Sequence, residues 1–381
     1  MEKGWKTIKM ADAFELQMGK TPSRNNPDYW DGTETWVSIG DMGVSKYIGT
    51  SKEQISKKAV SDTGIKLLPQ ETVIMSFKLS VGKVAITSKP LFTNEAIMSF
   101  TPKKGFSFLA DYIYYYLKGY KWDGTNRAVM GITLNKASIS QGVFSYPSLS
   151  EQKRIVAELD LLTDVIDKQK QQLKELDTLA QSIFYDMFGD PVENDRGWKT
   201  DALSNVAPQK QYDGVVPSYR GHYWLLNLDM VEQQTGRVIE RILLPSSEIG
   251  SSITTFDTSN VLYSKLRPYL NKVVIPDAIG YATSELVPLK PNPKVLGRVF
   301  LAYLLRSKSF VDYISVKVAG AKMPRVSMDV LRAFAVILPS IALQQSFAMK
   351  IEAIEKQKEN INQSIAQTQK LFDYTMDKYF G

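Results

Sequence analysis

One stretch of this chain occurs twice, 192 residues apart. Residues 146–152 read YPSLSEQ, and residues 338–344 read LPSIALQ at the same place in the second half. Each copy begins a long segment of helical character that ends in Phe-Gly, at Gly189 and again at Gly381. This period is far longer than the roughly 20–50 residues of solenoid repeats. The chain is therefore predicted to be a duplicated module, in which each copy holds a globular domain followed by a long helix.

The two long segments share one hydrophobic register. From residue 155 to residue 187 the seam positions recur at alternating spacings of four and three, and the same register returns in the second copy. This heptad pattern is typical of a coiled coil. The polar seam residues Gln169, Lys358 and Thr368 are expected to fix the register at some cost in stability. The apolar seam residues are Ile155, Leu159, Leu162, Ile166, Leu173, Leu176, Ile351, Ile354, Ile361 and Ile365.

The simplest packing brings the two seams together within the chain. A globular domain lies between the helices in sequence, which allows them to run antiparallel and to separate the two domains. The alternative is that each amphipathic helix packs only against its own domain. The predicted organisation is a globular domain at 1–147, a helix at 148–189, a second globular domain at 190–338 and a second helix at 339–381.

The globular segments are expected to be mixed α/β domains, which makes the fold class α+β. Short β-branched and aromatic runs alternate there with Gly, Pro and Asp. One helix is expected in each domain, at 109–117 and at 299–306. The pattern differs from that of a βαβ dinucleotide-binding fold. Strands are expected at 72–77, 83–87 and 96–101 in the first domain and at 261–264, 272–275 and 285–290 in the second.

Signatures of catalysis and of metal binding are missing from the sequence. The chain has no cysteine, which excludes disulfides and thiolate metal sites, and its single histidine, His222, argues against a His-ligated metal or a Ser-His-Asp site. No glycine-rich phosphate-binding motif occurs either. We therefore predict no catalytic residue and no metal site. Because no signal-peptide or membrane-spanning run is present, a cytoplasmic protein is expected.

The net charge of +7 is unevenly distributed. Residues 151–188 carry five Lys/Arg and eight Asp/Glu, residues 343–380 carry five of each, and the remainder therefore holds a charge of +10. The basic excess lies in the globular domains, where a nucleic-acid-binding surface requires it. The plainer interpretation is a generally basic protein whose surface cations are only solvated.

Basic and polar residues in predicted loops are the candidates for contact with nucleic acid. Lys, Arg and Ser suit phosphate, while Arg suits guanine and Asn suits adenine. Trp30, Trp36, Trp122 and the tyrosine-rich run 112–116 are expected in the core rather than as platforms for base stacking. The candidates are Lys20, Ser23, Arg24, Asn126 and Arg127 in the first domain and Ser264, Lys265, Arg267, Lys322 and Arg325 in the second.

Several segments resemble a known family. Residues 19–23 (GKTPS), 26–30 (NPDYW) and 36–41 (WVSIGD) look like the opening of a target-recognition domain in type I restriction-modification specificity subunits. Residues 147–191, from PSLSEQK to MFGDP, resemble the central conserved region of that family, and residues 339–381 resemble the distal one. The second domain departs from the family pattern, because it has QYDG at 211–214 where the GKTPS opening is expected.

The resemblance implies two target-recognition domains held apart by two antiparallel helices, in a subunit that catalyses nothing. Each domain would read one half of a bipartite, asymmetric site in double-stranded DNA. The helices would dock two modification subunits, which methylate adenine, and restriction subunits with translocase and nuclease activity would join the larger assembly. S-adenosylmethionine, ATP and Mg²⁺ would be bound by these partner subunits, so no cofactor and no membrane contact are expected for this chain.

Two other functions fit parts of the pattern. A coiled-coil scaffold or a DNA-mimicking decoy would bind partners without reading bases, but a mimic should be acidic, and the charge of +10 outside the helices argues against it. An enzyme acting on nucleic acid is disfavoured because the catalytic motifs are missing.

Overall fold

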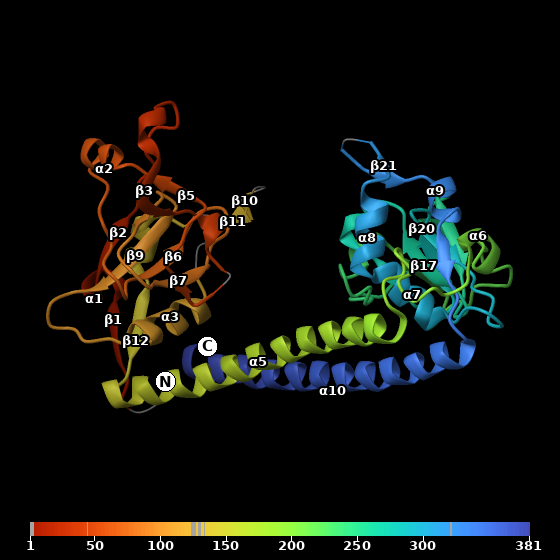
Figure 1. The fold of residues 1–381 in the computed structure, drawn as a ribbon. Helices are drawn as coiled ribbons and strands as arrows, with labels where there is room; N and C mark the ends of the chain where they lie inside the picture. The colour runs from red at the N-terminus through yellow and green to blue at the C-terminus, as the bar shows by residue number, and fades with distance from the viewer. Residues whose placement is uncertain (1–3, 44, 123–126, 129–130, 133, 321) are drawn as a thin grey trace. The chain divides into compact units, whose positions relative to one another are not determined.

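The computed structural model describes residues 4–43, 45–122, 127–128, 131–132, 134–320 and 322–381 (Figure 1). The chain forms two compact units. Unit 1 comprises Met1–Lys168 and Ser364–Gly381, and unit 2 comprises Gln169–Gln363. Each unit therefore holds one globular domain and a part of both long helices, α5 (Leu149–Phe188) and α10 (Ile341–Phe380). The prediction of two mixed α/β domains and two long helices is confirmed.

Unit 1 is built around a five-stranded sheet of order β2-β9-β6-β7-β4, in which β4 and β7 run parallel and the other neighbours antiparallel. The central strands read VIMS and VAIT and are buried throughout, as expected for strands covered on both faces. A sheet of order β5-β3-β8 and the pair β1-β12 flank it. The strands are β1 (Lys6–Lys9), β2 (Phe14–Met18), β3 (Trp30–Val37), β4 (Tyr47–Ile48), β5 (Glu53–Ile55), β6 (Val73–Ser76), β7 (Val84–Thr87), β8 (Phe92–Thr93), β9 (Ile97–Pro102), β10 (Arg127–Ala128), β11 (Gly131–Ile132) and β12 (Val143–Tyr146). The helices are α1 (Met10–Ala13), α2 (Lys57–Thr63), α3 (Ala110–Gly119) and α4 (Lys136–Gln141), with 3-10 helices η1 (Pro27–Tyr29) and η2 (Ile39–Asp41).

Unit 2 contains sheets of order β15-β14-β19-β16 and β18-β17-β20, with the pairs β13-β23 and β21-β22. As in unit 1, one central strand, here β17, lies between two antiparallel neighbours. The strands are β13 (Thr200–Ala202), β14 (His222–Leu226), β15 (Ile242–Pro245), β16 (Ile253–Phe256), β17 (Val261–Ser264), β18 (Val273–Val274), β19 (Gly280–Thr283), β20 (Leu286–Leu289), β21 (Val318–Ala319), β22 (Arg325–Val326) and β23 (Ala335–Ile337). The helices are α6 (Leu203–Val206), α7 (Arg298–Arg306), α8 (Lys308–Ser315) and α9 (Met328–Arg332), with 3-10 helices η3 (Leu228–Met230), η4 (Ser246–Glu248) and η5 (Pro268–Leu270).

The repeated segment at the start of each long helix attaches that helix to its domain. Gln152 and Gln344 occupy the same place in the repeat and are 1% and 2% exposed. The Gln152 carboxamide accepts a hydrogen bond from the Leu109 backbone N–H at the start of α3, and Gln344 accepts one from the Gly297 N–H at the start of α7. Each glutamine also donates to the proline carbonyl of its own repeat. The two glutamines therefore satisfy N–H groups at helix starts that have no intrahelical partner.

In unit 1 the helix α3 packs its tyrosine-rich face against the core and the end of α10. Tyr112 and Tyr116 contact the Phe380 ring at centroid distances of 5.6 and 5.7 Å. The Tyr115 hydroxyl donates to Asp160 on α5 at 2.6 Å. Burial raises the pKa of all three tyrosines, which therefore stay protonated as hydrogen-bond donors. The expectation that the run 112–116 lies in the core is confirmed, since all five residues are buried.

In unit 2 the corresponding contact is made by phenylalanines. Phe188, at the end of α5, lies 4.7 Å from Phe300 on α7 and 5.3 Å from Phe347 on α10. Phe184 joins the same cluster, and all four side chains are buried. This cluster fixes α7 against both long helices within the unit.

The two long helices pack against each other in both units, and they run antiparallel. In unit 1 the Arg154 guanidinium on α5 donates to the Tyr379 hydroxyl on α10 at 3.0 Å. In unit 2 Lys358 on α10 forms an ion pair with Asp177 on α5, with an N–O distance of 2.8 Å. The start of α5 thus lies beside the end of α10, and the end of α5 lies beside the first half of α10. None of the helices in the described part of the chain combines the length and the apolar composition that crossing a membrane requires.

The seam residues serve two contacts at once. Ile155 and Leu159 belong to the core of unit 1, and Ile351 and Ile354 belong to the core of unit 2. Each apolar stripe therefore packs on a globular domain as well as on the other long helix. Both packing modes considered from the sequence, helix on helix and helix on domain, occur together. Of the ten apolar seam residues, Ile166 is buried like these four, and the half-buried ones are Leu162, Leu173, Leu176, Ile361 and Ile365.

Candidate nucleic-acid interface

In unit 2 two distant segments bring predicted basic residues together. The loop between β17 and β18 hydrogen-bonds to the segment around β22. The Arg267 backbone N–H donates to the Pro324 carbonyl at 2.8 Å, and the Val326 N–H donates to the Lys265 carbonyl at 3.0 Å. An isolated β-bridge places Arg325 opposite the residue between Lys265 and Arg267. Three of the predicted cations therefore lie at neighbouring backbone positions.

The cations of this cluster differ in their partners. Arg325 forms an ion pair with Glu285 at 3.0 Å, so part of its charge is already neutralised. Arg267 is exposed, and its guanidinium has no hydrogen bond or ion pair with any residue that the structure describes. Lys322, three residues before Arg325, is exposed as well. Arg267 and Lys322 are thus available to an external acceptor, whereas Arg325 is already paired.

The two serines predicted as phosphate contacts have structural partners. Ser264 is 2% exposed, and its hydroxyl donates to the Leu266 carbonyl at 2.9 Å, which shapes the loop from inside. The Ser23 carbonyl accepts a hydrogen bond from the Trp30 indole N–H at 3.1 Å, while the residue itself is exposed. Of the two hydroxyls, Ser23 is the one that faces solvent.

In unit 1 the predicted cations follow β2. Arg24 donates to both carboxylate oxygens of Glu53, and its guanidinium carbon lies 3.8 Å from the centroid of the Trp30 ring. The hydrogen bond from Arg24 lowers the pKa of Glu53. The Lys20 ammonium is exposed and donates to the Thr63 carbonyl at 2.5 Å. A phosphate would therefore have to replace Glu53 at Arg24, whereas Lys20 has only a backbone carbonyl to release.

The two remaining candidates of unit 1 are Asn126 and Arg127. Asn126 lies outside the described residues. Arg127 is described through its backbone alone, in β10, which pairs antiparallel with β11.

A matching arginine–tryptophan contact in unit 2 was not predicted from the sequence. Arg241 lies 4.5 Å from the centroid of the buried Trp224 ring and pairs with Asp277. In unit 1, Arg24 lies 5.5 Å from the buried Trp36. Trp36 begins the run WVSIGDM and Trp224 begins WLLNLDM, an internal repeat at an offset of 188 that was the available signal. Burial of both rings assigns them to the core rather than to base stacking.

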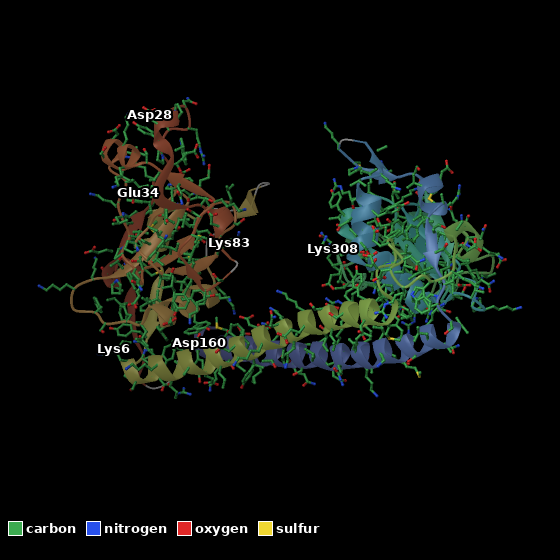
Figure 2. The ribbon with its side chains drawn as sticks, in the orientation of Figure 1. Lys6, Asp28, Glu34, Lys83, Asp160 and Lys308 are labelled. Atoms are coloured by element: carbon green, nitrogen blue, oxygen red, sulfur yellow. The ribbon has the colours of Figure 1, made fainter. Side chains whose placement is uncertain are left out.

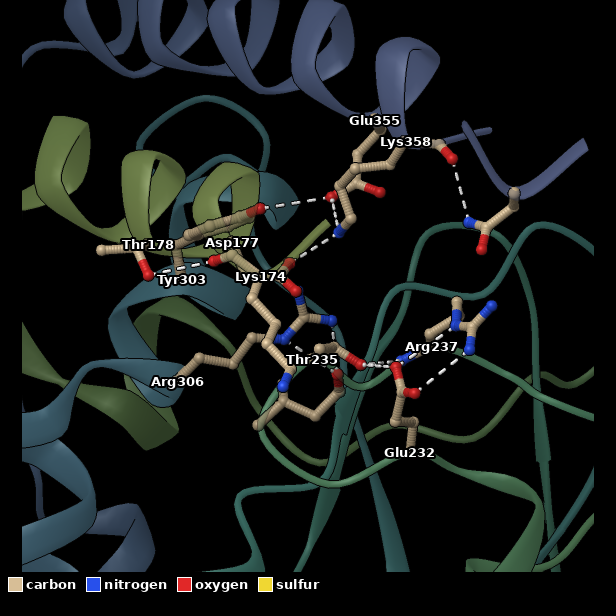
Figure 3. A network of polar contacts seen from close by, with 12 residues as sticks. Lys174, Asp177, Thr178, Glu232, Thr235, Arg237, Tyr303, Arg306, Glu355 and Lys358 are labelled. Carbon is tan, nitrogen blue, oxygen red and sulfur yellow. Dashed lines mark hydrogen bonds and ion pairs between the residues drawn. The ribbon is translucent and has the colours of Figure 1, made fainter. Parts of the chain in front are cut away.

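A charged network in unit 2 joins the domain to both helices (Figure 3). The Lys358 ammonium contacts Asp177 at 2.8 Å and Glu355 at 2.9 Å, and its side chain is only 11% exposed. The Tyr303 hydroxyl on α7 donates to Glu355 at 3.5 Å, and Arg306, on the same helix, donates to a backbone carbonyl of β18. Burial raises the pKa of Tyr303 and lowers that of Arg306. These groups satisfy one another, so the network holds the polar seam position Lys358 in place.

Among the residues that the structure describes, no group of three or more His, Cys, Asp or Glu side chains is arranged to hold a metal ion.

Comparison with known proteins places this architecture. The family model of the type I restriction modification DNA specificity domain matches residues 2–178. The type I restriction enzyme MjaIX specificity subunit of Methanocaldococcus jannaschii is 24% identical, over 99% of this chain and 92% of that protein. Residues 2–178 therefore belong to the family of type I restriction-modification specificity subunits, and the whole chain aligns with relatives that carry this name. The EcoDI specificity subunit of Escherichia coli is 21% identical, over 99% of this chain and 88% of its own length.

Solved structures from type I restriction-modification systems share the fold of this chain. A chain from a study of complex assembly and conformational transition of the type I R-M system aligns with a TM-score of 0.60 at 15% identity, over 100% of this chain and 98% of that one. The S subunit of the type I restriction-modification system from M. genitalium aligns with a TM-score of 0.54 at 12% identity, over 100% and 97% of the two chains.

Proposed function

We propose that this specificity subunit recognises a bipartite, asymmetric site in double-stranded DNA, with each globular domain reading one half-site. The observation that carries the proposal is the cluster of Lys265, Arg267 and Arg325, which the fold assembles from two distant segments of the domain. Lysine and arginine contacts to phosphate supply most of the affinity of DNA-binding proteins. The charge of +10 outside the helices supports the same conclusion.

The helices are proposed to dock two modification subunits, one on each unit. Large apolar side chains are exposed on both helices, and a docked partner would cover them. In unit 1 they are Leu161, at 64% exposure, together with Leu371 and Tyr374, and in unit 2 they are Leu179 and Met349. Restriction subunits would join through the same assembly.

The chain is proposed to be non-catalytic. In this division of labour, S-adenosylmethionine, ATP and Mg²⁺ are bound by the modification and restriction subunits, and this chain supplies the DNA sequence preference. The relatives support the proposal, since they are named specificity subunits of type I restriction enzymes.

Selection from a randomised duplex library tests the proposal. The full chain, assembled with its modification subunits, is mixed with the library, and the bound duplexes are sequenced. We expect a motif of two unlike half-sites separated by positions without preference. Tight binding without any enriched motif would overturn the proposal. An assembly that binds modification subunits but no DNA would favour a coiled-coil scaffold or decoy instead.

A further inference from the structure

The loops that follow the central strands β6 and β17 are equivalent in the two units. Each begins after a buried serine, Ser76 or Ser264, whose backbone N–H donates to the carbonyl of a lysine that ends the loop, Lys83 at 2.9 Å or Lys272 at 3.0 Å. Each lysine then extends its ammonium group to the first carbonyl of a 3-10 helix. Lys83, labelled in Figure 2, reaches η2 at 3.2 Å, and Lys272 reaches η3 at 2.5 Å.

The residue after the serine makes the same two backbone hydrogen bonds in both units. The Phe77 N–H donates to the backbone carbonyl of the residue before β9, and the Lys265 N–H donates to the backbone carbonyl of the residue before β20, each at 3.0 Å. Their carbonyls accept from the N–H groups of Leu134 and Val326, at 2.9 and 3.0 Å. The two loops therefore share one backbone frame, and the loop in unit 2 is one residue longer.

Each loop presents one side chain from a left-handed backbone position. Leu79, three residues after Ser76, has a φ of 63°, and Arg267, three residues after Ser264, has a φ of 47°. This conformation costs free energy for any residue with a Cβ atom, and glycine would avoid the cost. Such strain persists where the surrounding structure enforces it, and it is concentrated at functional sites.

Neither side chain contributes to the core or to the polar contacts that the structure describes. Leu79 is 73% exposed, so its side chain lies outside the hydrophobic core. Arg267 is exposed, and its guanidinium has no hydrogen-bonding or ionic partner among the described residues. Cations suited to phosphate stand next to both, namely Lys78 beside Leu79 and Lys265 near Arg267. The two units share the same backbone frame in this loop. They differ in the side chain that the loop presents, which is apolar in unit 1 and cationic in unit 2.

We propose that Leu79 and Arg267 are the corresponding base-reading residues of the two domains, an inference that rests on the proposed recognition of DNA. Arg267 donates both arms of its guanidinium to N7 and O6 of a guanine in the major groove. Leu79 has no donor, and it contacts the C5-methyl group of a thymine. One loop frame thus reads two different bases, which makes the two half-sites differ at corresponding positions.

Glycine variants test the two side chains without disturbing the frame. Leu79→Gly and Arg267→Gly remove the side chain and relax the left-handed backbone, so the loops should stay folded. In the library selection with the full assembly, we expect Arg267→Gly to lose a guanine preference at one position of one half-site. The expected loss is roughly 5- to 150-fold, at about 1.4 kcal/mol per tenfold. Leu79→Gly should lose a thymine preference at one position of the other half-site, by a smaller factor.

Modified bases test the same contacts from the side of the DNA. 7-Deazaguanine lacks the N7 acceptor, and uracil lacks the C5-methyl group of thymine. The wild-type assembly should bind more weakly when either replaces the base at its assigned position. The matching glycine variant should be indifferent to that replacement, because the contact is already gone.

Two control variants and three contrary outcomes complete the test. Lys294→Ala removes an exposed cation before α7, and Leu67→Ala removes a leucine of unit 1 that is 54% exposed; neither should change the motif. A glycine variant that weakens all duplexes equally, or one that leaves the wild-type motif intact, would overturn the assignment of its side chain to a base. A wild-type assembly that enriches no motif would instead overturn the proposed function, and this assignment with it.

Discussion

Both domains are attached to the helices by the same glutamine, yet they pack against them with different side chains. In unit 1 the contact is polar at its edges, because α3 brings tyrosines whose hydroxyls find partners on α5 and on β12. In unit 2 the contact is made by four phenylalanines, with ion pairs at its side. Both glutamines accept a hydrogen bond from the N–H at a helix start and donate one to a proline carbonyl. The apolar side chains around them can differ between the units as long as the packed volume is conserved. The duplicated copies therefore retain their attachment while their packing and their loops diverge.

The largest expected effect tests whether the domains are independent in function. Replacing residues 1–147 by the equivalent domain of a relative should change one half-site completely and leave the other intact, because base contacts lie within a domain while the helices touch protein. Library selection with the chimeric chain measures both half-sites at once. A chimera in which both half-sites changed together would contradict the proposal that each domain recognises its half-site independently.

The second prediction compares the two aromatic contacts. Phe188→Ala should lower the free energy of unfolding by about 3–5 kcal/mol, since the ring is fully buried among three others. Phe380→Ala in unit 1 should cost roughly half as much, because that ring is only half-buried. Urea denaturation measures both values. Tyr374→Ala, at a side chain 68% exposed, is the control and should change stability by less than about 0.5 kcal/mol. Equal costs at Phe188 and Phe380 would contradict the distinction.

The third prediction concerns the shared glutamine. Gln152→Ala and Gln344→Ala should each cost about 1–3 kcal/mol, because each leaves a partly buried N–H at a helix start without its partner. Amide hydrogen exchange at Leu109 and Gly297 should report the loss directly. Gln171→Ala, on the exposed surface of α5, serves as the control. A large cost in one unit and none in the other would show that the attachment is not equivalent.

The smallest effect is expected at the polar edge of unit 1. Desolvation acts to raise the pKa of Asp111, but hydrogen bonds from Lys46 and Tyr47 outweigh it and hold the pKa below its ordinary value of 3.8. A depressed pKa adds stability above pH 3.8, and this stability is lost as the pH falls through the folded value. Lys46→Met should therefore cost about 1–2 kcal/mol at neutral pH and less in acid.

Urea denaturation at neutral pH and in acid measures this difference. Lys46 also pairs with Asp160 on α5 at 2.6 Å, so the substitution removes both ion pairs of that ammonium group (Figure 2 labels Asp160). Lys104→Met, at an exposed position, should show no such pH dependence. A cost for Lys46→Met that stays constant into acid would assign it to packing rather than to charge.

The order of domains and long helices along the chain could be predicted, because it follows from local sequence patterns. The heptad spacing marked both helices, and the short β-branched runs marked the strands β6 and β7, whose burial on both faces the structure then showed. The basic character of the loop after Ser264 was visible in the sequence as well. That this loop lies against β22 was not, because the contact joins residues about 60 positions apart through backbone groups that every sequence possesses.

The finer features of the interface lay beyond sequence reasoning for physical reasons. Arg24 looks like a free cation, and its partner Glu53 is brought to it only by the pairing of β3 with β5. Leu79 has the composition of a core residue, and its exposure follows from a left-handed backbone that the loop frame enforces. The equivalence of the two loops was hidden because their offset is 188 at the serines, not the 192 of the helices.

The division of the chain between the units also sets an order of completion during synthesis. Unit 2 is one continuous stretch, Gln169–Gln363, whereas unit 1 also needs Ser364–Gly381. Phe372 and Tyr379 in that last stretch are buried in the core of unit 1. A ribosome adds about 5–20 residues per second, so the first domain waits roughly 10–40 s after residue 168 for its final side chains. The domain that is synthesised first is therefore completed last. A nascent chain that stops before residue 372 carries all of its second domain beside a first domain whose tyrosine-rich face is still uncovered.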